Sequence, residues 1–175
     1  MRIIAGRWRG HPIAAPPGRR TRPTTDRVRE AWMSVLQHDV PGARVLDLFA
    51  GSGALGLEAL SRGAARVTFV EIAQAPLRAL RANVERLDAA REVDIAREDA
   101  LRYVQKLEPA AFDIALADPP YGEGHAAELV RLFRERPFAR ILGIEHRAGE
   151  LADAGPDVVV RRYGDTALTF ITADP

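Results

Sequence analysis

The fold is decided by one short stretch of the sequence, Asp47-Leu48-Phe49-Ala50-Gly51-Ser52-Gly53-Ala54-Leu55-Gly56. It follows directly from an apolar run whose length suits a buried strand. Its glycines allow the backbone to turn sharply from strand to helix and to approach a ligand closely. The stretch therefore predicts the strand–loop–helix unit of an α/β domain, with a binding site at the loop.

The chain after residue 43 alternates short apolar runs with helical patterns. The expected strands are Arg44–Phe49, Arg66–Ile72, Val93–Arg97, Phe112–Ala117 and Arg140–Glu145. The expected helices between them are Ala54–Ser61, Ala75–Leu87, Ala100–Leu107 and His125–Arg134. Two further strands, Val158–Tyr163 and Thr166–Thr172, flank the turn signal Gly164-Asp165. This order predicts a Rossmann-like α/β fold, with a mostly parallel sheet that finishes in an antiparallel hairpin.

The first 40 residues have a different pattern. Arg2–Ala5 and Arg9–Ala14 are expected to form two short strands around Gly6. Residues 16–23 contain three prolines and no hydrophobic anchor, which predicts an exposed, mobile loop. Helical spacing then predicts an amphipathic helix over Asp26–Gln37, and its N-cap candidates are Thr24, Thr25 and Asp26. We expect residues 1–40 to be an N-terminal extension of a hairpin, a mobile loop and a helix, and residues 41–175 to be the main domain.

Charge is distributed unevenly along the chain. The net charge is +1, but residues 1–30 carry +6 and the remainder carries −5. A basic arm on an acidic body indicates a polyanionic partner, although a solvated arginine-rich tail would have the same composition. The absence of cysteine excludes disulfides and thiolate metal sites, and the four histidines lack ligand spacing, so we expect no metal. No apolar run reaches the length of a membrane span, and we expect a cytoplasmic monomer.

The glycine loop and the end of the next strand predict an adenosine-containing cofactor. Glu71 ends the second strand, where a carboxylate can accept hydrogen bonds from ribose hydroxyls. The glycine spacing also fits a dinucleotide such as NAD. Asp47 favours S-adenosylmethionine, because an acid there can face a cationic amino-acid group but repels a pyrophosphate. The predicted cofactor residues are Asp47, Gly51, Ser52, Gly53, Glu71, Ile72, Asp99 and Ala100.

Two of these residues have structural alternatives. Asp99 follows the third strand, where it can accept from an adenine amino group or serve as a helix N-cap. Ile72 can pack on the adenine ring or in the core. A glycine-rich turn that only packs helix on strand is a third alternative, disfavoured because Asp47 and Glu71 both lie in register.

The tetrapeptide Asp118-Pro119-Pro120-Tyr121 follows the fourth expected strand and indicates the chemistry. An exocyclic base amine is a poor nucleophile, because its lone pair is delocalised into the ring. Acceptors on its N–H bonds, here the Asp118 carboxylate and the Pro119 carbonyl, stabilise the charge that develops during attack. The prolines lock the backbone and Tyr121 can stack on an extruded base. A rigid turn, with Asp118 as a cap, is the structural alternative.

Together these motifs resemble the class I amino-methyltransferases. More narrowly, the chain resembles the bacterial family that methylates guanine 966 of 16S ribosomal RNA on N2. The resemblance rests on the glycine loop, the tetrapeptide and three further stretches: Arg2–Gly10, Arg22–Glu30 and Tyr163–Leu168. It implies a seven-stranded sheet and a substrate in the small ribosomal subunit or an assembly intermediate. It also implies that RNA is bound by the arm, for which the candidate phosphate contacts are Arg7, Arg9, Arg19, Arg20 and Arg22. Thr24 and Arg27 begin the helix nearest the site and are further candidates for contact with cofactor or RNA substrate; helix capping and a surface ion pair are the alternatives.

Two rival functions remain open at this stage. One is a methyltransferase for another amine, such as that of DNA adenine, although the chain has no spare length for a DNA target-recognition domain. The other is a noncatalytic RNA-binding protein that keeps the fold. Against it, every expected catalytic and cofactor position carries a chemically competent residue.

Overall fold

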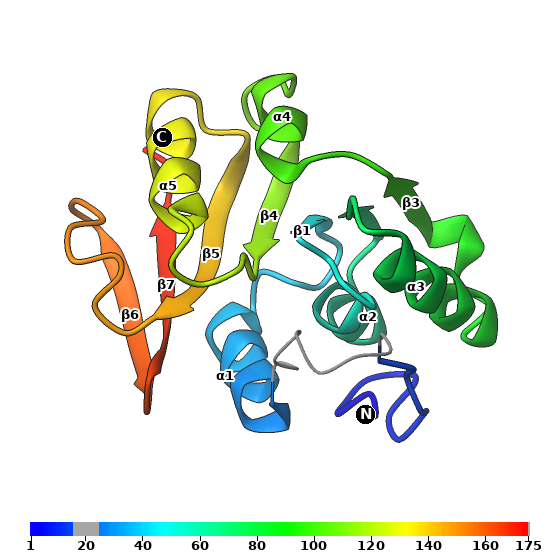
Figure 1. Ribbon diagram of the computed structural model, residues 1–175. Helices are drawn as coiled ribbons and strands as arrows, with labels where there is room; N and C mark the ends of the chain where they lie inside the picture. The colour runs from blue at the N-terminus through cyan, green and yellow to red at the C-terminus, as the bar shows by residue number, and fades with distance from the viewer. Residues whose placement is uncertain (16–24, 175) are drawn as a thin grey trace.

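The computed structural model describes residues 1–15 and 25–174 and contains one seven-stranded sheet (Figure 1). Its strand order is β3-β2-β1-β4-β5-β7-β6. The bounds are Arg44–Leu48 (β1), Arg66–Val70 (β2), Val93–Ala96 (β3), Phe112–Ala117 (β4), Ala139–Arg147 (β5), Val158–Tyr163 (β6) and Thr166–Thr172 (β7). Neighbours from β3 to β5 pair in parallel, and β7 is antiparallel to both β5 and β6. The expected fold class, including the closing hairpin, is confirmed.

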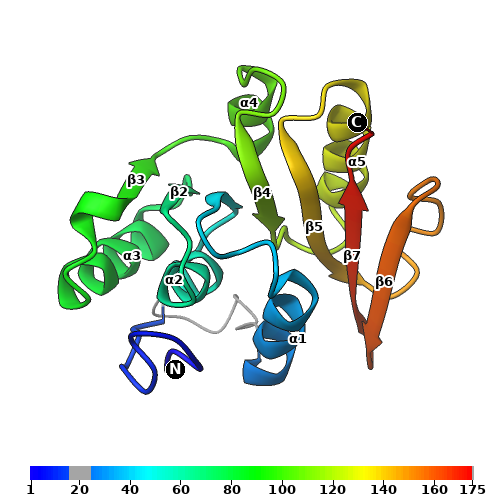
Figure 2. The same cartoon turned by 180° about the vertical axis from the view of Figure 1, so that it is seen from behind.

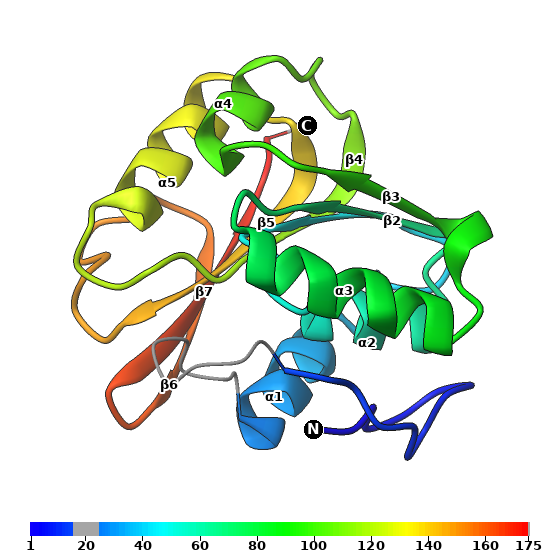
Figure 3. The same cartoon turned by 45° about the vertical axis from the view of Figure 1, so that its right-hand side comes forward.

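Helices cover both faces of the sheet, as Figure 3 shows. Their bounds are Asp26–Leu36 (α1), Ala54–Ser61 (α2), Gln74–Arg86 (α3), Ala100–Gln105 (α4) and His125–Glu135 (α5), with a short 3-10 turn at Ala90–Glu92. The N-terminal segment, α1, α2 and α3 lie on one face, and α4 and α5 lie on the other. Successive strand residues point to opposite faces, so that Val45 packs in the first core and Leu46 in the second.

The expected elements match the observed ones to within a few residues, and the differences have local causes. β1 stops at Leu48 because Phe49 has a positive φ of 55° and leaves the strand. β5 extends to Arg147 because antiparallel pairing with β7 continues to Thr166. Thr25 is the N-cap of α1 and accepts from the Val28 N–H at 3.3 Å. The predicted loop over residues 16–23 lies outside the described residues.

The prediction of two N-terminal strands is wrong. The structure has a single antiparallel bridge between Arg2 and Pro12. The Ile3 N–H donates to the His11 carbonyl at 3.0 Å and the Ile13 N–H to the Met1 carbonyl at 2.8 Å on either side of this bridge, and Gly6 turns the chain with a φ of 86°. Between Arg2 and Pro12 the backbone bonds to α2 instead: the Ile4 N–H donates to the Glu58 carboxylate at 3.0 Å, and the Trp8 N–H donates to the Ser61 hydroxyl at 3.1 Å.

Glu58 is the buried anchor for this N-terminal segment (residues 1–15), which lies beside α2 in Figure 2. Its carboxylate also accepts from the Ala5 N–H at 3.0 Å and from Arg62 Nε at 3.0 Å. The Arg29 guanidinium, fully buried like Glu58, places its Nη1 3.6 Å from Glu58 Oε2. Ile3 and Ile13 belong to the same apolar core as β1 and α2. The segment is therefore packed onto the sheet-bearing part of the chain rather than around a core of its own.

We expect Glu58→Gln to lower the free energy of unfolding by about 3 kcal/mol, because Arg29 and Arg62 would keep only the exposed carboxylates of Asp26 and Glu30 as ionic partners. The amide also offers only one acceptor oxygen to several donors. In thermal denaturation, this corresponds to a fall in Tm of roughly 6–12 °C.

Glu30→Gln is the matched control, because Glu30 also pairs with Arg62, at 3.0 Å, but is half exposed. Its expected cost is below about 1 kcal/mol. Equal losses in the two variants would contradict the anchoring role of Glu58.

Candidate active site

The parallel register brings three carboxylates to one edge of the sheet. Leu48 of β1 pairs with Val70 of β2 and with Ala117 of β4, so these strands end at the same level. Glu71 and Asp118 come directly after β2 and β4, and Asp47 is the penultimate residue of β1. The three predicted acids therefore meet at the carboxyl edge, where ligands bind in this class of fold.

Glu71 holds the glycine loop against the end of β2. Its Oε2 accepts from the Gly51 N–H at 2.8 Å, and its Oε1 accepts from the N–H groups of Ile72 at 3.0 Å and Ala73 at 2.9 Å. Gly51 has a φ of 58°, and a Cβ at this position would meet nothing within 4 Å. The loop backbone at Gly51 thus faces open space. Oε2 of Glu71 accepts one N–H and retains a further acceptor site, whereas Oε1 already accepts two.

Asp47 is 2% exposed and lies beneath the loop. Burial raises the pKa of its carboxyl well above the ordinary value; the hydrogen bond from the Gly56 N–H opposes this shift, and the charges of Asp118 and Glu71 reinforce it. The Gly56 bond is 2.9 Å long. A Cβ on Gly56 would lie 2.4 Å from the Phe69 ring, so this glycine is required by the packing of helix on strand.

Asn83, on α3, connects the glycine loop to the N-terminal segment. Its amide donates to the Ser52 carbonyl at 2.9 Å and to the Ala14 carbonyl at 2.9 Å, and it accepts from the Ala14 N–H at 2.8 Å. Asn83 is not among the residues predicted from the sequence. The available signal was a polar side chain at a position of α3 whose helical neighbours are apolar and buried.

The residues expected near an adenine ring differ in their surroundings. Ile72 is 57% exposed at the end of β2, so the core-packing alternative is wrong. Asp99 is the N-cap of α4 and accepts from the Arg102 N–H at 3.0 Å, which confirms the capping alternative and leaves a cofactor contact as a prediction. Ala100 is buried, as is Ser52, whereas Gly53 is the left-handed N-cap of α2.

The tetrapeptide lies at the end of β4 as expected. Asp118 is half-buried, Pro119 is buried and Pro120 is exposed. The Tyr121 hydroxyl donates to Glu145 Oε1 at 3.1 Å and lies 3.1 Å from Thr166 Oγ1. Glu145 belongs to β5 and Thr166 to β7, so the closing strands orient the tyrosine. Neither residue is among those predicted from the sequence.

The electrostatic surroundings keep Tyr121 protonated at neutral pH. Burial raises the pKa of its hydroxyl to about 12, with the Thr166 hydrogen bond opposing the shift and the Glu145 charge adding to it. The carboxylate of Glu145 is itself 5% exposed and lies 3.5 Å from Trp32 Nε1. Tyr121 is therefore a neutral aromatic ring with a fixed hydroxyl, beside the half-buried Asp118.

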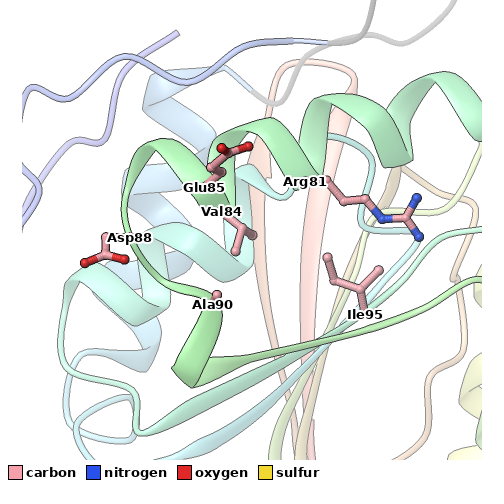
Figure 4. Close-up of a pocket in the computed structure, with 6 residues that line it drawn as sticks. All are labelled: Arg81, Val84, Glu85, Asp88, Ala90 and Ile95. Atoms are coloured by element: carbon pink, nitrogen blue, oxygen red, sulfur yellow. The ribbon is translucent and has the colours of Figure 1, made fainter.

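Hollows on the described surface differ in their distance from the tetrapeptide. One, of about 380 Å³, is lined by Tyr121, Arg147, Ala148 and Asp165. Another, of about 250 Å³, lies between α3 and β3, where Figure 4 shows Arg81, Val84 and Ile95 around it. None of the expected catalytic or cofactor residues lines this second hollow. The first therefore adjoins the tetrapeptide, and the second belongs to a different part of the sheet.

Arg7, Arg9 and Arg27, the predicted RNA-contacting arginines that the structure describes, are exposed. Arg7 pairs with Glu92 at 2.6 Å and lies 4.0 Å above the Trp8 ring. Arg27 lies 5.7 Å from the Tyr163 ring, and Arg9 is open to solvent. The remaining candidates, Arg19, Arg20, Arg22 and Thr24, lie outside the described residues.

Neither a metal cluster nor a membrane-spanning helix is found in the described ranges. Across residues 1–15 and 25–174, no three His, Cys, Asp or Glu side chains gather in a way that could hold a metal ion. No helix in the same ranges has both the length and the apolar character needed to cross a bilayer.

Comparison with known proteins relates the fold and the site to a family. The family model described as conserved hypothetical protein 95 matches residues 1–170. Ribosomal RNA small subunit methyltransferase D of Escherichia coli K12 is 40% identical to this chain, and the alignment covers 90% of this chain and 79% of the relative. A Bacillus subtilis protein named as a proposed rRNA methyltransferase is 35% identical, covering 98% and 96%.

A solved structure supports the same assignment. That of a proposed methyltransferase from Escherichia coli superposes with a TM-score of 0.82 and 32% identity, covering 97% of this chain and 96% of its own. The chain therefore belongs to the family of conserved hypothetical protein 95, together with bacterial proteins named as ribosomal RNA methyltransferases.

Proposed function

We propose that the protein transfers a methyl group from S-adenosylmethionine to the exocyclic N2 amine of a guanine in 16S ribosomal RNA. The observation that carries this proposal is the placement of the tetrapeptide beside Asp47 and Glu71 at one edge of the sheet. The names of the relatives favour an RNA of the small ribosomal subunit as the substrate. Guanine 966 is the target that the family resemblance implies.

The chemistry of the residues at this edge fits S-adenosylmethionine. Three neighbouring carboxylates favour a ligand with a cationic sulfonium and ammonium, and they disfavour the pyrophosphate of NAD. The open backbone at Gly51 and the exposed Ile72 provide room and an apolar surface for an adenosine. The residues that would hold it are Asp47, Gly51, Ser52, Gly53, Glu71, Ile72, Asp99 and Ala100. When bound, S-adenosylmethionine supplies an electrophilic methyl carbon on sulfur.

The tetrapeptide prepares the amine for attack. The Asp118 carboxylate and the Pro119 carbonyl accept hydrogen bonds from the two N–H groups of the amine. These bonds favour a pyramidal nitrogen and stabilise the positive charge that develops on it. Held in this way, the amine nitrogen would be able to bond to the methyl carbon that S-adenosylmethionine supplies, with the sulfur as the leaving group. The surplus proton leaves the nitrogen for Asp118 or water. Pro119 and Pro120 keep the carbonyl in place, and Tyr121 presents its ring to the extruded base.

The basic arm is proposed as the RNA-binding part of the chain. Exposed arginines on the N-terminal segment and at the start of α1 can contact phosphates, and residues 1–30 carry +6. The proposed contacts are Arg7, Arg9, Arg19, Arg20, Arg22, Thr24 and Arg27. We propose that a cytoplasmic monomer acts on the small subunit or its precursor. A noncatalytic RNA-binding role is disfavoured by the clustering of the three acids with the tetrapeptide.

We expect Asp118→Asn to lower methyl transfer to unmodified small subunits by at least about 100-fold, because one stabilising contact to the developing charge is lost. The assay uses labelled S-adenosylmethionine, with free RNA and DNA as competing acceptors, and the labelled nucleoside is identified by mass spectrometry. Affinity for S-adenosylhomocysteine should stay nearly unchanged.

Asp113→Asn is the control for this variant, since Asp113 lies at the opposite end of β4 and pairs with Arg44 at 3.5 Å. It should transfer methyl groups at the wild-type rate. Label on adenine of DNA, or full activity in Asp118→Asn, would contradict the proposal.

Replacing Arg19, Arg20 and Arg22 together with alanine should weaken RNA binding and flatten its dependence on salt. Each lost phosphate contact reduces the slope of log K against log salt by about 0.7–0.9. Fluorescence anisotropy with small-subunit RNA at several salt concentrations measures the slope.

The control variant replaces Arg44, Arg136 and Arg140 with alanine. These three exposed arginines lie near the amino ends of the parallel strands, at the edge of the sheet opposite to the candidate site. An unchanged slope in the arm variant, or an equal change in the control, would show that the arm does not bind RNA.

A further inference from the structure

The closing hairpin contributes to the active site. Its turn, Gly164-Asp165, connects β6 to β7, and the next residue, Thr166, lies 3.1 Å from the Tyr121 hydroxyl. The Asp165 carbonyl accepts from the Ala148 N–H at 2.7 Å. The turn is therefore fixed beside the tetrapeptide, and Asp165 lines the 380 Å³ hollow with Tyr121, Arg147 and Ala148.

The hollow, which we call the Tyr121 pocket, combines three kinds of recognition group. Tyr121 supplies an aromatic face, Arg147 supplies hydrogen-bond donors, and Asp165 supplies acceptors. The Arg147 guanidinium lies 5.9 Å from the Tyr121 ring. Within residues 1–15 and 25–174, neither this guanidinium nor the Asp165 carboxylate makes a hydrogen bond or an ion pair, so both are available to a ligand.

The walls of the Tyr121 pocket are held rigidly. Arg147 and Thr166 are paired residues at the end of the β5–β7 ladder. Glu150 accepts from the N–H groups of Arg147 at 3.2 Å and Gly122 at 3.0 Å, which ties the tetrapeptide turn to the end of β5. Groups fixed to paired strands hold a preset geometry better than groups on free loops.

We propose that the Tyr121 pocket selects guanine as the target base, with Asp165 accepting the guanine N1–H and Arg147 donating to O6. This inference rests on the proposed function and assigns its base specificity to residues outside the tetrapeptide. The chemical basis is the ring atom next to the reactive amine. In guanine the carbon that bears the amine has the N1–H donor on one side and the bare N3 on the other, whereas in adenine and cytosine its only ring-nitrogen neighbour is a bare lone pair and no donor is present.

A carboxylate beside the amine therefore discriminates among the amine-bearing bases. It gains a hydrogen bond from guanine and faces a repulsive lone pair in adenine or cytosine, so the same group favours one base and rejects the others. Arg147 adds to this difference, because guanine presents an acceptor at O6 and arginine is the usual donor to it. Asp118 alone gives no such discrimination, since all three bases carry an amine.

The test uses 16S RNA with a single replaced nucleotide at the mapped target position, assembled into small subunits. The target is guanine, 2-aminopurine or adenine; 2-aminopurine keeps the amine but has a lone pair at N1 and no O6. The wild type should methylate guanine with a kcat/KM about 10- to 100-fold above that for 2-aminopurine. Asp165→Asn should bring this ratio down about tenfold, because its amide can donate to the N1 lone pair.

Arg147→Gln provides a second, independent pattern. It should slow methylation of guanine and leave 2-aminopurine nearly unaffected, since 2-aminopurine has no O6 to contact. The matched controls are Asp157→Asn and Arg161→Gln, which make the same chemical changes at exposed positions in or just before β6. Both controls should keep the wild-type ratio, and S-adenosylhomocysteine binding by all four variants confirms that they are folded.

The outcomes separate the two proposals. Absence of methyl transfer from the wild type to any ribosomal RNA base would overturn the proposed function. Methylation of guanine N2 with a guanine-to-2-aminopurine ratio that Asp165→Asn and Arg147→Gln leave unchanged would overturn only the role of the Tyr121 pocket. Methylation of 2-aminopurine and guanine with equal kcat/KM by the wild type would also overturn only the role of the Tyr121 pocket.

Discussion

The parallel pairing of β2, β1 and β4 is the constraint on which the site depends. Because these strands end at the same level, three carboxylates must share one edge of the sheet. Their mutual repulsion is offset by backbone donors: three N–H groups bond to Glu71 and one bonds to Asp47. The same bonds hold the glycine loop in place, so the binding site and the loop that forms it are stabilised together.

The order of the elements could be predicted from the sequence because it depends on local patterns. Hydrophobic periodicity, glycine and proline positions, and the turn at Gly164-Asp165 placed every strand of the sheet within a few residues. The N-terminal strands were wrong because the donors of Ile4 and Trp8 bond to Glu58 and Ser61 on a distant helix. No local sequence pattern indicates that these backbone N–H groups bond to side chains of a helix and not to a neighbouring strand.

The same reasoning explains which residues of the candidate site could be predicted. The positions of Asp47, Glu71 and Asp118 could be predicted because each lies at the end of a strand, and strand ends are visible in the local sequence pattern. Asn83, Glu145 and Thr166 act on residues 24 to 69 positions away, and only the packing and strand register bring them together. The closing hairpin is an example: its composition indicates a turn, but its place beside Tyr121 comes from the pairing of β5 with β7.

The most direct test of the central claim, a carboxylate-rich site for a cationic cofactor, is calorimetric titration of the wild type and Asp47→Asn. The ligands are S-adenosylmethionine, S-adenosylhomocysteine and NAD. The account predicts that the first two bind and NAD does not. It also predicts that Asp47→Asn weakens the binding of S-adenosylmethionine more than the binding of S-adenosylhomocysteine, because only S-adenosylmethionine carries the sulfonium charge. Two results would contradict the account. One is that the wild type binds NAD but not S-adenosylhomocysteine. The other is that Asp47→Asn binds S-adenosylmethionine as tightly as the wild type does.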